Sequence, residues 1–158
     1  MKKNILIVYY TRTGYTEKIV NQLTQKIEAD IEIIDDNKDR SGIIGYIKSA
    51  YDNIKKDRPK IKELKYKPAD YEFIVIATPV WVSKMAAPIR SFVYKYKNDI
   101  NKAVFITSQK GPVMQKVFDD MRKVLTKKEE FSIGFREKEL DNNIYQKKID
   151  KIIKNISS

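Results

Sequence analysis

Short apolar runs alternate with segments of helical periodicity along this sequence, and this alternation most limits the folds open to it. The runs are continuous and rich in Ile, Val and Phe, as in strands buried on both faces of a parallel sheet. The other segments place apolar residues three and four positions apart, which predicts amphipathic helices. We expect strands over 4–10, 30–35, 71–81, 102–109 and 130–135, and helices over 14–28, 41–56, 88–96, 114–125 and 145–156.

Five strands and five helices in strict alternation predict an α/β fold, a three-layer, doubly wound sandwich around a five-stranded parallel sheet. The strand order expected for such units is 2-1-3-4-5, which brings the loops after strands one, three and four to the same edge. Residues 57–70 contain two prolines and many charges, so we expect a surface connection there. Without repeats or a break in composition, the chain reads as a single domain over 1–158.

The sequence contains no Cys and no His. Disulfides, thiol nucleophiles, Ser-His or Cys-His catalysis and nearly all zinc chemistry are therefore excluded. We assign no catalytic residue and no metal site. Any chemistry must come from hydroxyls, carboxylates, amines or a borrowed cofactor.

The charge and hydropathy of the chain bear on its cellular compartment and on the charge of its binding partners. No apolar run of about 18 residues exists, so we expect no membrane span and a cytoplasmic protein. The net charge of +11, from 32 basic and 21 acidic residues, favours acidic partners. Because the lysines are spread along the chain among Glu and Asp, we do not expect nucleic-acid binding.

The loop after the first strand, "TRTGYT", carries Thr11, Thr13, Gly14 and Thr16 at the start of a helix. A helix N-terminus presents free N–H groups and a partial positive charge, which suit a phosphate group. Three hydroxyls are more than a helix cap requires, so we favour a phosphate site over the alternative of a plain capped turn. Neither the nucleotide triphosphate loop nor the dinucleotide fingerprint is present.

Two further loops are predicted at the same edge of the sheet. The loop after the third strand contains Trp81, the only tryptophan, two residues beyond Pro79. An aromatic side chain in this place can form a wall for a flat ring, although a lone tryptophan can also lie half-buried under a neighbouring loop. The loop after the fourth strand reads "SQKGP".

The "TRTGYT" loop and the stretch "ATPVWVSKMAAPIRSFV" closely resemble the phosphate and isoalloxazine loops of the flavodoxin-like family. The segment "DDNKDRSGIIGYIKSAYDNIK" also resembles part of small bacterial flavodoxins and FMN-dependent NAD(P)H oxidoreductases. The resemblance covers essentially the whole chain and implies a single flavodoxin-like domain that binds FMN non-covalently. It implies phosphate contacts at Thr11, Arg12, Thr13, Gly14, Tyr15 and Thr16, ring contacts at Pro79, Val80 and Trp81, and Ser108, Gln109, Lys110 and Gly111 near the pyrimidine edge of the ring.

The resemblance leaves more than one function open. We expect an electron carrier between partner proteins, and the alternative is an FMN-dependent oxidoreductase acting on NAD(P)H or a quinone. Typical electron-transfer flavodoxins are acidic, whereas this chain is basic, so a redox partner with an acidic surface is expected. A flavin-free basic binding module is the alternative of a different class.

Overall fold

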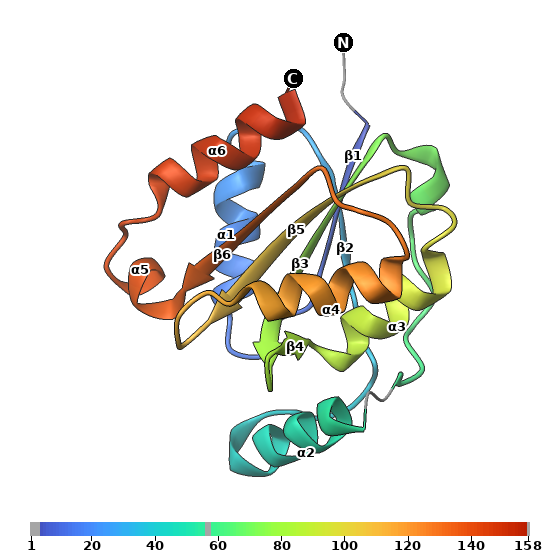
Figure 1. Ribbon diagram of the computed structural model, residues 1–158, viewed down its shortest axis with the longest axis vertical. Helices are drawn as coiled ribbons and strands as arrows, with labels where there is room; N and C mark the ends of the chain where they lie inside the picture. The colour runs from blue at the N-terminus through green and yellow to red at the C-terminus, as the bar shows by residue number, and fades with distance from the viewer. Residues whose placement is uncertain (1–3, 56–57, 158) are drawn as a thin grey trace.

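A parallel sheet forms the middle layer of the computed structural model, which describes residues 4–55 and 58–157 (Figure 1). Its strands are β1 (Ile5–Tyr9), β2 (Asp30–Ile33), β3 (Phe73–Trp81), β5 (Lys102–Gln109) and β6 (Phe131–Arg136). They lie in the order β2-β1-β3-β5-β6, and every neighbouring pair in this order is parallel. The predicted α/β class and the predicted order 2-1-3-4-5 of the five parallel strands are confirmed.

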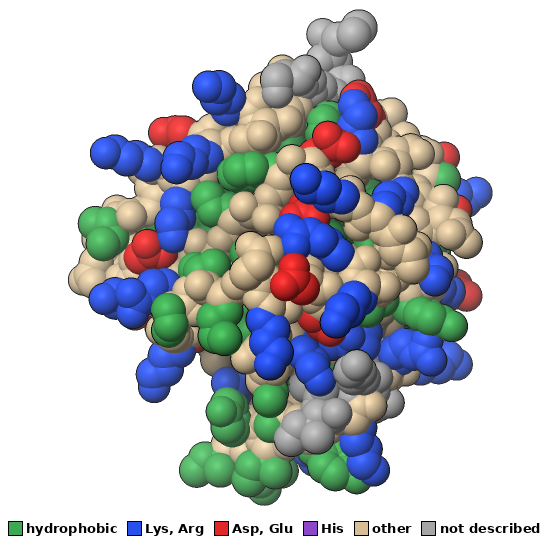
Figure 2. Space-filling model, viewed as in Figure 1, with side chains coloured by type: hydrophobic (Ala, Val, Ile, Leu, Met, Phe, Trp, Pro, Cys, Tyr) green, Lys and Arg blue, Asp and Glu red, His purple; other side chains and the backbone are tan. Residues whose placement is uncertain are grey.

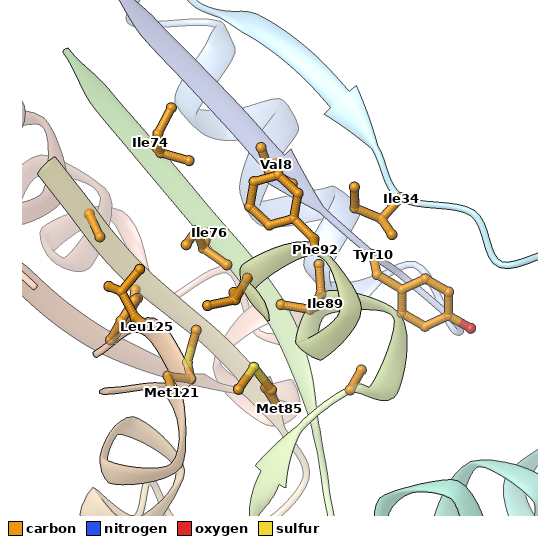
Figure 3. Packing of buried hydrophobic residues seen from close by; sticks show 14 of the residues in the cluster. Val8, Tyr10, Ile34, Ile74, Ile76, Met85, Ile89, Phe92, Met121 and Leu125 are labelled. Carbon is orange, nitrogen blue, oxygen red and sulfur yellow. The ribbon is translucent and has the colours of Figure 1, made fainter. Parts of the chain in front are cut away.

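Helices cover both faces of the sheet. One face packs against α1 (Tyr15–Thr24) and α6 (Gln146–Ser157), and the other against α3 (Ala87–Tyr96) and α4 (Gln115–Leu125) (Figure 1). Successive strand residues point to opposite faces, so Ile7 joins the first core and Val8 the second. In the second core, Val8, Ile74 and Ile76 of the strands lie opposite Ile89 and Phe92 of α3 (Figure 3).

Two short elements were not predicted. The strand β4 (Lys84–Met85) turns back and pairs antiparallel with the end of β3, and α5 (Glu137–Asp141) follows β6 directly. Both are too short to show a hydropathy period in the sequence. The turn between β3 and β4 consists of Val82 and Ser83, which have φ angles of 51° and 60°.

The remaining helix, α2 (Gly42–Ile54), lies beyond the carboxyl end of the sheet instead of over one of its faces (Figure 1). The chain after it does the covering. Ile61 is buried in the core beside α3, Leu64 and Tyr66 pack against that core, and a 3-10 turn, Pro68–Asp70, leads into β3. The expectation that 57–70 is only a surface connection is therefore wrong for its described part, 58–70, because that part packs its apolar side chains into the core.

Nowhere in the described parts of the chain is there a helix with both the length and the apolar character needed to cross a membrane.

Candidate functional site

The carboxyl edge of the sheet brings the three predicted loops together. Thr16 at the start of α1 and Ser108 near the end of β5 are both buried, and their hydroxyl oxygens are 2.8 Å apart in a hydrogen bond. The loops after β1 and β5 therefore meet directly. The loop after β3 lies between them in the sheet order, because β3 pairs with both β1 and β5.

The N-terminus of α1 has no side-chain cap. Its N-cap residue is Gly14, which has a φ angle of 91°, a backbone conformation that glycine adopts without strain. The N–H of Gly14 donates to Thr11 Oγ1 over 3.0 Å, and its carbonyl oxygen accepts from the N–H of Lys18 over 2.9 Å. The N–H groups of the first helical turn have no acceptor within the helix, so they are available to an anion. The absence of a side-chain cap argues against a plain capped turn and supports the predicted phosphate site.

The other residues of the first loop differ in what they offer. Thr13 is exposed, and the half-buried Arg12 places its guanidinium 5.6 Å from the ring centre of Tyr46 in α2. Tyr15 turns its hydroxyl away to donate to Asp141 of α5 over 3.1 Å. Tyr15 can therefore contribute its backbone N–H but not its side chain.

Trp81 is more deeply buried than an aromatic side chain that packs against a ligand ring needs to be. Only 8% of its surface is exposed. The ring of Tyr10 lies perpendicular to it with 5.5 Å between ring centres, and the guanidinium of Arg40 lies 5.1 Å from its ring centre. Arg40 is in turn paired with Asp36 at 2.7 Å, and both side chains are 2% exposed. Trp81 also lines a small cavity of ≈ 50 Å³ with Val80 and residues of α2. The burial expected of a lone tryptophan is found, and its contact with a flat ring stays a prediction.

The third loop is held by Gln109. Its side-chain amide donates to the carbonyl of Pro112 over 2.7 Å, and its side-chain oxygen accepts from Thr107 Oγ1 over 3.0 Å. The side chain of Gln109 therefore braces the loop from within. Lys110 and Gly111 follow in the exposed tip of the loop.

Charged groups from three elements act on one another at this edge. Burial raises the pKa of the Glu137 carboxyl in α5, the Lys110 ammonium opposes the rise, Asp141 adds to it and Arg12 opposes it. Two phenols at the end of β1 remain neutral at ordinary pH. Burial raises the pKa of Tyr10 to about 12, and burial together with the carboxylate of Glu17 raises that of Tyr9 to about 12.

A second hollow lies beside the phosphate loop. Its volume is ≈ 310 Å³, and it is lined by Tyr10, Thr11 and Arg12 on one side and by the loop after β2 on the other. That loop supplies Asp36 and Arg40, and both residues are buried. Their segment is dense in charges and resembles a solvated turn, so nothing in the pattern marks them as buried.

Comparison with known proteins assigns the fold to a family. The family model described as Flavodoxin matches residues 4–156. A flavoprotein of Lactobacillus acidophilus, solved in complex with FMN, is 20% identical and superposes with a TM-score of 0.72 over 89% of this chain and 97% of its own. A Bacteroides eggerthii protein, provisionally described as a flavoprotein, is 18% identical with a TM-score of 0.79 over 98% of each chain. These two likenesses show a shared fold. Among curated proteins, none matches the chain.

Proposed function

The chain belongs to the flavodoxin family, and on that premise we propose that it binds FMN non-covalently and carries electrons between partner proteins. The observation that carries the proposal is the first turn of α1, where Gly14 leaves the helix N–H groups without a side-chain cap at the edge where three loops meet. The Lactobacillus acidophilus relative, which was solved with FMN, supports the same choice of ligand.

The phosphate group of FMN is proposed to lie on the loop from Thr11 to Thr16. The backbone N–H groups of Tyr15 and Thr16 and the exposed hydroxyl of Thr13 are the donors, and Arg12 adds a positive charge. The hydroxyl of Thr16 is already bonded to Ser108, so its role is to hold the first and third loops together. Gly14 keeps the approach to the helix open, since nothing lies within 4 Å of where its Cβ would stand.

The flavin ring is proposed to lie against Pro79 and Val80, which are half-buried at the end of β3, with Trp81 beneath them. Backbone groups of Ser108, Gln109, Lys110 and Gly111 would face its pyrimidine edge. Bound FMN supplies the redox chemistry, so a chain without His or Cys can take part in electron transfer. The residues of the chain bind and orient the cofactor and shield it from water.

The small cavity beside the second loop favours a carrier over a reductase that would hold NAD(P)H or a quinone between that loop and α2. The cavity between Val80, Trp81 and α2 measures ≈ 50 Å³, whereas sites for small molecules typically measure about 300–1,000 Å³. A nicotinamide or quinone would find little room there. Electron transfer to a docked protein requires no such pocket.

A flavin titration followed by anaerobic reduction tests the proposal. FMN should bind one to one, and its fluorescence should be quenched on binding. Riboflavin lacks the phosphate and so loses the charge-assisted hydrogen bonds, and it should bind at least about tenfold more weakly. Stepwise reduction should then proceed in two separable one-electron stages, and NADPH alone should not bleach the complex. Rapid bleaching by NADPH would instead identify a reductase, and failure to bind FMN would overturn the proposal in favour of the flavin-free module.

A further inference from the structure

The large apolar side chains that the structure describes in α2 face solvent. Helical spacing places them together, as the sequence predicts, but on the outside of the molecule. The exposed fractions are 81% for Ile43, 70% for Ile44, 61% for Tyr46, 61% for Ile47 and 56% for Tyr51, and Val82 in the neighbouring turn is 51% exposed. We call these six residues the apolar rim. Hydrophobic side chains gather at the foot of the space-filling view, over α2 (Figure 2).

The inward face of α2 explains why the apolar rim cannot turn inside. Over the residues whose side chains are described, that face carries Gly45 and Ser49, which are small and buried. A Cβ at Gly45 would stand 1.9 Å from the carbonyl carbon of Arg40, so only glycine allows this approach. Ser49 donates its hydroxyl to the carbonyl of Gly45 over 2.8 Å. A rotation of α2 would drive larger side chains into the Arg40 backbone.

The face of the sheet that a crossover helix would cover is already occupied. Ile61, Leu64 and Tyr66 of the segment that follows α2 pack there. The apolar rim therefore has no place in the core, and an exposed apolar patch of this kind marks an interaction surface.

The apolar rim borders the proposed cofactor site. Tyr46 receives the guanidinium of Arg12 from the phosphate loop, and it lines the small cavity together with Trp81 and Val82. Val82 stands in a left-handed backbone conformation that is unusual for a β-branched residue, and such strain is concentrated at functional positions. A protein bound to the apolar rim would thus lie next to the cofactor.

Positive charges surround the apolar rim. Lys55 holds its ammonium 4.6 Å from the ring centre of Tyr51, Arg12 lies over Tyr46, and Lys48 is exposed on α2 itself. Asp39, an exposed acid that precedes the N-terminus of α2, accepts hydrogen bonds from the N–H and hydroxyl of Ser41. With a net charge of +11 on each chain, a second copy would be repelled, whereas an acidic protein would be attracted.

The size of the apolar rim also distinguishes between occupants. A helix of 13 residues is about 20 Å long and about 10 Å wide with its side chains, so its exposed face has a footprint of roughly 200 Å². Stable dimers bury about 800 Å² or more on each partner, whereas transient redox encounters bury less. The apolar rim fits a transient encounter.

We propose that the apolar rim is the docking surface for an acidic one-electron redox protein that has an apolar contact patch of its own. This inference rests on the proposed electron-carrier function and names the chemistry of the partner. Apolar contact holds the two proteins together near the cofactor, and the surrounding lysines and Arg12 steer the encounter.

The test is a titration of the ¹⁵N-labelled protein with an acidic [2Fe–2S] ferredoxin, followed by amide chemical shifts. Shifts should concentrate in α2 and at Val82, and added salt should weaken binding because the attraction is electrostatic. The double variant Ile43→Ser/Ile47→Ser should bind about tenfold more weakly. The matched control is Ile144→Ser, which alters an equally exposed isoleucine (68%) between α5 and α6 and should bind like the wild type. A basic cytochrome c should not bind.

Several results would overturn the inference. They are wild-type affinity in the double variant, absence of ferredoxin binding, shifts that map away from α2, or a wild-type dimer in sedimentation that the double variant dissolves. An FMN titration of the same samples separates the two proposals. Loss of FMN binding in the wild type would contradict the cofactor proposal alone, because the ferredoxin titration needs no flavin. A double variant that binds FMN normally but loses ferredoxin supports the docking surface.

Discussion

Thr16 and Ser108 stand 92 residues apart in the sequence, yet their hydroxyl oxygens share a buried hydrogen bond of 2.8 Å. The bond ties the first turn of α1 to the end of β5. It therefore sets how the proposed phosphate loop stands relative to the loop that would meet the edge of the flavin ring.

Replacing Thr16 with Val should weaken FMN binding about fivefold. The substitution keeps the shape of the side chain but removes the hydroxyl, which leaves Ser108 without its partner and costs roughly 1 kcal/mol. The measurement is a fluorescence titration with FMN. Thr24→Val, at the far end of the same helix, is the control and should bind as the wild type does; equal affinities for both variants would contradict this role for Thr16.

Replacing Gly14 with Ala should destabilise the fold and weaken FMN binding together. The left-handed backbone at Gly14 costs an L-residue about 1–2 kcal/mol, and relief of that strain would move the first helical N–H groups. Urea unfolding and FMN titration measure the two effects. Gly42→Ala is matched to it, since Gly42 also has a positive φ of 64° and open space around it. It should lose stability while its FMN affinity is unchanged.

Replacing Arg40 with Met should lower the free energy of unfolding by about 3–5 kcal/mol, because the carboxylate of Asp36 would remain buried without its partner. The intrinsic fluorescence should change as well, since Arg40 lies over the only tryptophan. Lys62→Met breaks an exposed pair with Asp35 and should cost less than about 1 kcal/mol.

The double variant Asp36→Asn/Arg40→Met should recover part of the lost stability, because it removes both buried charges. If the single and double variants were equally unstable, packing and not charge would explain the loss.

Replacing Glu137 with Gln should stabilise the protein above neutral pH. Burial raises the pKa of this carboxyl above its ordinary value of 4.5, so the folded state binds the proton more tightly than the unfolded state does. The cost of the buried charge is present at high pH and is relieved as the pH falls through the raised pKa towards 4.5. Urea unfolding at about pH 8 and about pH 5 should show a gain for the variant that shrinks at the lower pH. Exposed Glu28→Gln changes the net charge equally and should show no such gain.

The parts of the fold that the sequence predicts well are those where one interaction dominates. The strand over 102–109 has the predicted bounds, because its continuous apolar run can only be satisfied by burial on both faces. The start of α1 was also predicted, since the run of threonines around one glycine marks a helix N-terminus.

Other features depend on contacts between distant segments and leave no local pattern. The periodicity of α2 predicts which side chains share a face. Which face lies inside is decided by the close approach of Gly45 to the backbone of Arg40. The pairing of Asp36 with Arg40, and of Arg40 with Trp81, likewise arises only once the loop after β2 folds over the end of β3.

The segment 58–70 covers the face of the sheet that α2 leaves uncovered. Selection for a stable core therefore acts on that segment, and selection for binding acts on the outer surface of α2. Substitutions at Ile43, Ile44 and Ile47 change only the outer surface of α2, while the packed interior and the turn proposed to bind the phosphate group keep their side chains. On the docking role proposed for α2, a few such substitutions would change the partner that the protein binds and require no compensating change in its core.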